Sequence, residues 1–278
     1  LKPILYRGYD IKDLAEKSCF EEVAYLLING HLPCRQELHK FSKYILKGQI
    51  CQHAQGAKKL QIILDQIPQN AHPMDILKFA VSFFGLTADL SKKTELLATD
   101  LLAKISSMLI WIMNADFKNH WLSKESFTEN TLREIAFKPP TSLAQKAFDV
   151  SLILYAEHEL AASTFNARVT ASTLSDYYSC ILSAIGTLKG PLHGGANEAV
   201  MKMLAEINDP KITKKWIENA LLNKQKIMGF GHPVYKHGDP RSPIIESYAK
   251  KLSQELSQWK WYEMAKIIEK MLLQERGL

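Results

Sequence analysis

Apolar side chains recur at intervals of three and four residues along most of this chain of 278 residues. That interval places them on one face of an α-helix. Strictly alternating apolar and polar positions are scarce, and so are the Asn-Gly and Asp-Gly pairs that are typical of tight β-hairpins. Hydrophobic residues make up 46% of the chain, enough for a substantial core. We therefore expect an all-α fold, in one large domain or two smaller ones.

Local signals give the expected bounds of two helices in the first half. Ser18-Cys19-Phe20-Glu21 has the form of a capping box, and Gly30 lies where a helix-ending glycine belongs. A second helix should begin after Pro139-Pro140. Residues 147–156 are apolar nearly all round, so we expect this helix to be buried among others.

Proline and glycine mark three further helices, which are expected at about residues 175–189, 210–222 and 242–273. The first of them ends at Gly190-Pro191. The other two begin at Asp209-Pro210 and Ser242-Pro243, with proline at the first helical position.

The formal net charge of +6 comes mostly from lysine. The lysines are interleaved with glutamates along the expected helices and do not gather with aromatic residues on one element, so we expect no nucleic-acid binding. A mildly positive field favours a small polyanion as a ligand, although charge alone does not identify one.

Cysteine spacing and hydropathy indicate the cellular compartment of the protein. The four cysteines lie far apart and form no Cys-x-x-Cys pair, which predicts neither a disulfide framework nor a thiolate metal site and fits a reducing cytoplasm. The apolar run Met108–Met113 is too short to span a bilayer, and no basic segment followed by an apolar one opens the chain. We expect a cytoplasmic protein without a membrane anchor.

His193 lies in a joint between two expected helices. Gly190, Gly194 and Gly195 remove side-chain bulk around it, and the helix expected from about Ala196 offers free N–H groups and a positive dipole end. An imidazole there should stay neutral and can donate a hydrogen bond to a carbonyl that is becoming an enolate. The alternative is a glycine-rich joint with an incidental histidine.

His232 and Arg241 are nine residues apart on a segment rich in glycine and proline. A guanidinium binds a carboxylate bidentately, while a nearby imidazole can polarise an adjacent keto group. Together they predict a site for an α-keto acid. The alternative is a turn with a surface arginine.

His158 follows the expected central helix, and Tyr155 lies one turn earlier on the same helix face, so both side chains could point into one cavity. A single histidine there is more often structural. His232 and His237 lack the helical spacing and carboxylate partner of a zinc site, and the glycines match no nucleotide-phosphate loop. We therefore expect neither a metal nor a cofactor.

Three segments in this order, Tyr155–Glu159, Gly190–Glu198 and Gly229–Arg241, closely resemble the citrate synthase family. Tyr6–Ile11 and His72–Asp75 extend the resemblance. It implies a multihelical all-α homodimer, in which a large domain (residues 1–189, incomplete) and a small domain (190–278) close over oxaloacetate before an acyl-CoA binds. Acyl-CoA is then a substrate and not a cofactor.

The resemblance also implies roles for single residues. His193 would hydrogen-bond the thioester carbonyl during enolisation, and His232 would polarise the oxaloacetate ketone. Substrate binding would fall to Tyr155, His158 and Arg241. The backbone around the CoA adenine would come from Lys226, Ile227, Met228, Gly229 and Phe230.

Family members carry the aspartate that takes the acyl α-proton in a motif beyond the point that corresponds to the last residue here, and no aspartate follows Asp239. We therefore expect residues 1–278 alone to be inactive. The segments Tyr155–Glu159 and His72–Asp75 look more like the branch that makes 2-methylcitrate from propionyl-CoA than the branch that makes citrate from acetyl-CoA. The alternative to an enzyme is a non-catalytic helical remnant.

Overall fold

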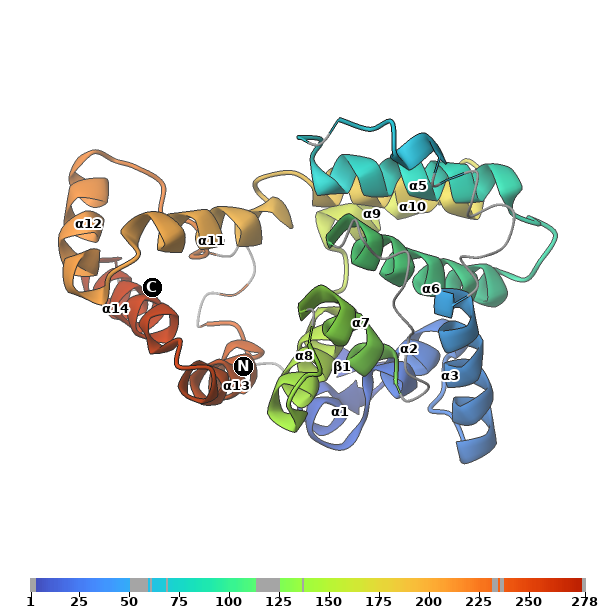
Figure 1. The fold of residues 1–278 in the computed structure, drawn as a ribbon, viewed down its shortest axis with the longest axis horizontal. Helices are drawn as coiled ribbons and strands as arrows, with labels where there is room; N and C mark the ends of the chain where they lie inside the picture. Colours follow the sequence, from blue (N-terminus) through green and yellow to red (C-terminus); the bar gives the residue numbers. More distant parts are fainter. Residues whose placement is uncertain are drawn as a thin grey trace. The chain divides into compact units, whose positions relative to one another are not determined.

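The computed structural model describes residues 4–50, 60, 62–68, 70–113, 126–136, 138–231, 235 and 238–276. Helices dominate these residues, which confirms the all-α prediction, and a short antiparallel hairpin precedes them (Figure 1). The elements are β1 (Leu5–Tyr6), β2 (Tyr9–Asp10), α1 (Ile11–Lys17), α2 (Phe20–Asn29), α3 (Arg35–Ile50), α5 (Pro73–Thr87), α6 (Thr94–Met113), α7 (Phe127–Ala136), α8 (Ser142–Tyr155), α9 (Ala162–Ser172), α10 (Tyr177–Leu188), α11 (Gly195–Ile207), α12 (Pro210–Leu222), α13 (Ser242–Glu255) and α14 (Trp259–Arg276).

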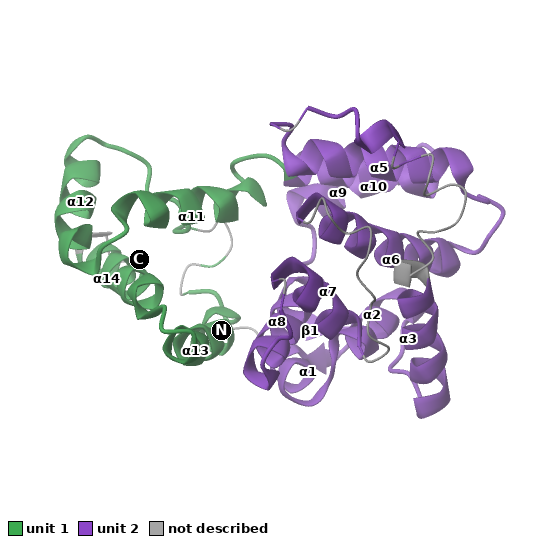
Figure 2. Ribbon diagram, in the orientation of Figure 1, with its two compact units in different colours: residues 1–4, 189–278 green, residues 5–188 purple. Residues whose placement is uncertain are grey.

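The chain divides into two compact units, which Figure 2 shows in different colours. Unit 2 is Leu5–Leu188 and holds the hairpin and the helices from α1 to α10. Unit 1 is Lys189–Leu278 together with Leu1–Ile4, and it holds α11 to α14. Each unit has an apolar cluster of its own.

Helix α2 begins one residue later than the sequence predicts. Its N-cap is Cys19, whose backbone N–H donates to Glu22 Oε2 at 2.9 Å, so the capping box is formed by Cys19 and Glu22. Ser18 instead ends α1. The predicted end is confirmed, because Gly30 follows α2 with a φ of 89°.

Two buried carboxylates explain why the cap is shifted. Glu21, only 4% exposed, turns inward and accepts a hydrogen bond from the backbone N–H of Phe127, the first residue of α7, at 2.9 Å. Asp149 of α8 does the same for Phe20, the first residue of α2, also at 2.9 Å. Burial raises the pKa of Asp149, and the hydrogen bond from Phe20 opposes that rise. The start of α2 is thereby bonded to the middle of α8, and the start of α7 to the first turn of α2.

Helix α8 is the buried helix that the sequence predicts. Thr141 caps it by accepting a hydrogen bond from the backbone N–H of Ala144 at 3.1 Å. Val150, Ile153 and Leu154 are almost fully buried, and α8 contacts α1, α2 and α7. Its C-terminal end carries Tyr155 and leads into His158.

A second group of helices in unit 2 is formed by α5, α6, α9 and α10. Helices α5, α6 and α10 share an apolar cluster that includes Leu77, Val81, Leu101, Met108 and Tyr178, and α9 packs on α10. Gly85 of α5 lies directly against Tyr178 of α10. A Cβ atom at residue 85 would be 3.0 Å from the Cβ of Tyr178. Glycine therefore sets how closely α5 and α10 approach.

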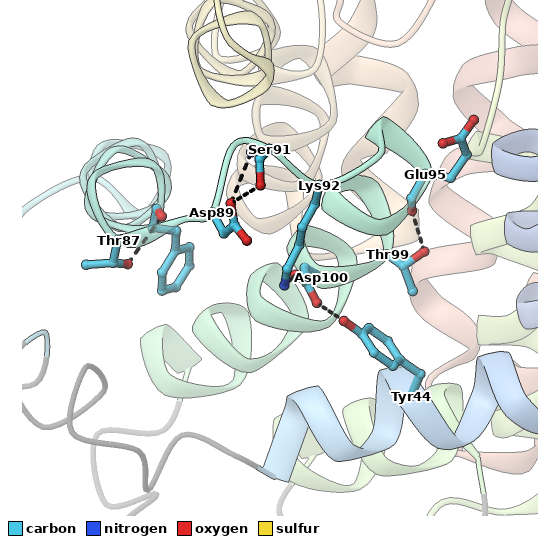
Figure 3. A network of polar contacts seen from close by, with 9 residues as sticks. Tyr44, Thr87, Asp89, Ser91, Lys92, Glu95, Thr99 and Asp100 are labelled. Atoms are coloured by element: carbon cyan, nitrogen blue, oxygen red, sulfur yellow. Dashed lines mark hydrogen bonds and ion pairs between the residues drawn. The ribbon is translucent and has the colours of Figure 1, made fainter.

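Polar contacts join α3 to α6 beside this cluster (Figure 3). Tyr44 of α3 donates to Asp100 Oδ1 at 2.5 Å, and Lys92 Nζ lies 3.2 Å from the other oxygen of Asp100. The hydrogen bond to Asp100, together with partial burial, raises the pKa of Tyr44 to about 12. The phenol thus remains a donor at neutral pH.

The apolar run Met108–Met113 is the end of α6, a helix of 20 residues that is long and apolar enough to cross a membrane. Of the apolar window in this helix, 44% is buried inside the structure. Leu97, Leu101 and Met108 contribute to the cluster shared with α5 and α10, as expected of a core helix.

Unit 1 packs α11, α12 and α14 around Leu204, Ile207, Ile217, Met264 and Ile268. The start of α12 agrees with the sequence prediction, because Pro210 is its first residue and the side chain of Asp209 accepts from the backbone N–H of Lys211 at 2.9 Å.

The long last helix predicted from Ser242 to about Leu273 is wrong in two respects. It is two helices, α13 and α14, separated by a turn in which Ser257 has a φ of 53°. Its N-cap is Arg241, so Pro243 occupies the second helical position. The break lets α14 turn its apolar face toward α12. No glycine or proline in the sequence marks this break, because it depends on tertiary packing.

We expect Gly85→Ala to be less stable than Gly186→Ala by about 1–3 kcal/mol, the usual cost of overpacking. Both glycines lie in helices, so both variants gain helix propensity of up to about 1 kcal/mol. Only residue 85 has a neighbour in the way, because nothing lies within 4 Å of a Cβ at residue 186. Denaturant unfolding of both variants measures the difference, and equal stability would contradict this account of the α5–α10 contact.

Candidate active site

His193 lies in a tight turn between α10 and α11, as the glycines around it predict. Its backbone N–H donates to Gly190 O at 3.0 Å, and the N–H of Gly195 donates to the same oxygen at 3.1 Å. A Cβ at residue 195 would be 2.8 Å from Lys189 O, so only glycine fits where α11 begins. Helix α11 starts two residues after His193, which confirms the predicted helix.

The segment Lys226–Phe230 lies against α11 within the same unit. Ile227 is buried, and Phe230 packs beside it on the cluster formed by α11, α12 and α14. Gly229 has a φ of 90°, and a Cβ there would be 2.7 Å from a methyl group of Val200 on α11. Lys226 is exposed and Met228 is half-buried. One helix thus supports both this segment and the turn that holds His193.

Arg241 immediately precedes α13, and its guanidinium is paired with Asp239. Nε of Arg241 lies 3.0 Å and 3.2 Å from the two carboxylate oxygens, and Nη2 lies 2.6 Å from Oδ2. The same carboxylate accepts the backbone N–H of Arg241 at 2.9 Å. The arginine side chain is 18% exposed, and residues 239–242 form the turn that the alternative interpretation also predicts.

His232 and His237 lie outside the described residues, so the pairing of His232 with Arg241 stays a prediction. Among the residues that the structure describes, no group of three or more His, Cys, Asp or Glu side chains is arranged to hold a metal ion.

In unit 2, α8 ends at Tyr155, three residues before His158. The helical spacing that would put both side chains on one face therefore does not extend to His158. Tyr155 is 66% exposed, whereas His158 is half-buried and its Nε2 atom is covered. The prediction that these side chains share a helix face is wrong, because the chain leaves helical geometry between them.

Tyr6 of β1 fixes the point at which α8 ends. Its hydroxyl lies 2.9 Å from Ile153 O and 3.0 Å from Glu157 O, and the backbone N–H of Glu157 donates back to it at 3.3 Å. The tyrosine is 1% exposed. A phenol from the first strand thus holds the segment that carries His158.

Tyr6, Val200 and Asp239 are site residues for which the sequence analysis predicted no role. Tyr6 lies within one of the motifs that carry the family resemblance, and Asp239 comes two residues before Arg241. Neither position reveals its partner. Val200 is one of several apolar residues on α11, and only the backbone of Gly229 distinguishes it.

Comparison with known proteins gives a consistent result. The profile of a family described as "Citrate synthase, C-terminal domain" matches residues 2–278. The 2-methylcitrate synthase of Shewanella oneidensis is 40% identical over 99% of this chain and 74% of that protein. The citrate synthase of Synechocystis sp. is 41% identical over 96% of this chain and 68% of that protein.

A solved structure is similar over nearly the whole chain. It is a ternary complex of carboxymethyl coenzyme A and oxaloacetate with the citrate synthase of Thermoplasma acidophilum. The TM-score is 0.87 at 32% identity, over 97% of this chain and 72% of that one.

Proposed function

The chain belongs to the citrate synthase family of acyltransferases, and we propose that it serves the Claisen-type condensation of propionyl-CoA with oxaloacetate. Hydrolysis of the thioester then gives 2-methylcitrate and free CoA. The observation that carries the proposal is the shared support on α11, which follows directly after His193 and packs against Lys226–Phe230. A hydrogen-bond donor and the segment assigned to CoA are thus held by one rigid element.

His193 has the chemistry that enolisation requires. Loss of a proton from the α-carbon of a thioester puts negative charge on the carbonyl oxygen, and a neutral imidazole can donate a hydrogen bond to that oxygen. The α-carbon then attacks the oxaloacetate ketone, which His232 is proposed to polarise. None of residues 1–278 is assigned as the base that accepts the proton from the α-carbon.

Oxaloacetate binding is assigned to Tyr155, His158 and Arg241. Arg241 suits a carboxylate because its planar fork binds two oxygens at once and keeps its charge. Asp239 holds the fork in one orientation through both carboxylate oxygens. A guanidinium that is already oriented loses less conformational entropy when the substrate binds.

The acyl donor is the finer part of the proposal. Tyr155–Glu159 and His72–Asp75 favour the propionyl-CoA branch, and the similar identity to a citrate synthase makes acetyl-CoA the second candidate. The two donors differ by one methylene, which a pocket distinguishes by only about 1–3 kcal/mol.

Exposed apolar residues on and just after α9 support the proposal of a homodimer. Asn166 donates to Thr187 Oγ1 at 2.7 Å, and Thr170 donates to Ser183 Oγ at 2.9 Å, so the polar face of α9 points to α10. Beside that polar face, Phe165 (58%) and Val169 (47%) are exposed, and so is Leu174 (95%) just beyond the helix. A second copy of the chain would cover these residues.

We expect the protein to sediment as a dimer and Phe165→Glu to raise the dimer dissociation constant at least about tenfold, because a buried unpaired carboxylate is costly. Leu222→Glu is the matched control, since Leu222 is also an exposed large apolar residue, on α12 of unit 1. Analytical ultracentrifugation distinguishes the outcomes. A monomeric wild-type protein, or equal dissociation in both variants, would contradict the proposal.

Thiol release tests the acyl donor directly. With the protein made from its complete reading frame and oxaloacetate present, we expect kcat/KM for propionyl-CoA to exceed that for acetyl-CoA by about tenfold or more, the lower range for one methylene. A preference for acetyl-CoA would make the protein a citrate synthase. Release with neither donor would favour the non-catalytic alternative.

The two assigned roles in unit 1 predict different defects. His193→Ala should lower kcat by at least about 100-fold, the lower range for one preorganised donor, and should leave oxaloacetate binding measurable. Arg241→Ala should mainly weaken oxaloacetate binding. Steady-state kinetics with oxaloacetate titration calorimetry separates the effects, and equal loss of both properties in each variant would show that the assignments are wrong.

A further inference from the structure

The end of α8 has one local closing bond, from the N–H of Ala156 to Ile153 O at 3.2 Å, and no left-handed residue at its C-cap. The C-cap residue Ala156 keeps right-handed helical angles, with φ −65° and ψ −32°, and no glycine follows it before Glu159. The last carbonyls of a helix have no partners within the helix itself. At α8 they face the hydroxyl of Tyr6, which lies 2.9 Å from Ile153 O and 3.3 Å from Leu154 O.

The Tyr6 hydroxyl also holds the chain beyond the helix. It lies 3.0 Å from Glu157 O and accepts the N–H of Glu157 at 3.3 Å. A phenol has one proton to donate and two lone pairs, so it can satisfy one of these carbonyls and accept from Glu157 at the same time. Both contacts of Glu157 are made by the backbone of the residue immediately before His158.

A second contact fixes the chain after His158. The carboxylate of Glu157 accepts the backbone N–H of Glu159 at 2.5 Å, and Glu159 has a φ of 52°, which is uncommon for a residue other than glycine. His158 therefore lies between two held peptide groups. Its side chain is half-buried with Nε2 covered, and the imidazole is carried on this held backbone.

We propose that Tyr6 is a positioning residue for His158, acting through the hydroxyl that closes α8 and holds Glu157. The proposal rests on the function given above, in which His158 binds oxaloacetate. A ring without the hydroxyl would still fill the core, because Tyr6 is 1% exposed. It would leave the α8 carbonyls and the N–H of Glu157 without this partner, and the segment would gain freedom.

The test is Tyr6→Phe in the protein made from its complete reading frame. We expect KM for oxaloacetate to rise about threefold to tenfold, the range for loss of one hydrogen bond, and KM for acyl-CoA to stay within about twofold of wild type. A purely structural defect would lower the active fraction, and with it the apparent kcat, without moving either KM. Tyr9→Phe is the matched control, because Tyr9 pairs with Tyr6 across the hairpin and is 44% exposed.

An unchanged KM for oxaloacetate in folded Tyr6→Phe, or an equal rise in both KM values, would overturn the inference. If Tyr6→Phe does not fold, Glu157→Ala carries the test, because it removes the second contact of the segment and leaves the core intact. The same selective rise is expected, and its absence would overturn the inference. Wild-type protein that turns over no acyl-CoA would overturn the proposed function, and this inference with it.

Discussion

Asp149, Glu21 and Tyr6 each bond to the end of a helix that is far from their own position in the sequence. The separations are 129, 106 and 147 residues. Helix ends leave N–H and C=O groups unpaired, and burying them without a partner costs free energy. Two of the three partners are carboxylates, and at helix N-termini they also meet the positive end of the helix dipole. These bonds set how α2, α7 and α8 pack, and the position of His158 follows from the end of α8.

Unit 1 meets a different constraint, the close approach of backbone to neighbouring atoms. Gly195 begins α11 against the carbonyls of Lys189 and Gly190, and Gly229 passes over Val200 on the same helix. Any larger residue would push one of these segments away. Since the turn with His193 and the segment Lys226–Phe230 both depend on α11, the assigned enolisation and CoA groups share one support.

The sequence predicts the helices wherever the signal is local. Asp209-Pro210, Thr141 and Gly30 act on the chain within a few residues, and each of these helix bounds agrees with the structure. Predictions failed where a distant partner decides the outcome. Glu21 has the spacing of a capping residue for Ser18 but bonds to α7 instead. The break at Ser257 follows from packing of α14 on α12 and has no local marker.

The candidate site follows the same rule. Glycine spacing predicted the turn at His193, where only glycine fits at the start of α11. The close approach of Gly229 to Val200 was not predicted. The carboxylate that orients Arg241 belongs to Asp239, only two residues earlier, but the spacing alone does not show that the two side chains pair. The phenol that closes α8 is a tertiary contact, which residue spacing does not reveal. The helical relation of Tyr155 to His158 failed because Tyr6 ends α8 between them.

The central claim is that the protein forms a carbon–carbon bond between oxaloacetate and an acyl group. The most direct measurement is mass spectrometry of the products formed from isotopically labelled oxaloacetate and propionyl-CoA by the protein made from its complete reading frame. The account predicts a labelled tricarboxylic acid that contains both carbon skeletons, formed one for one with free CoA. Free CoA without that acid would mean simple thioester hydrolysis and would contradict the account.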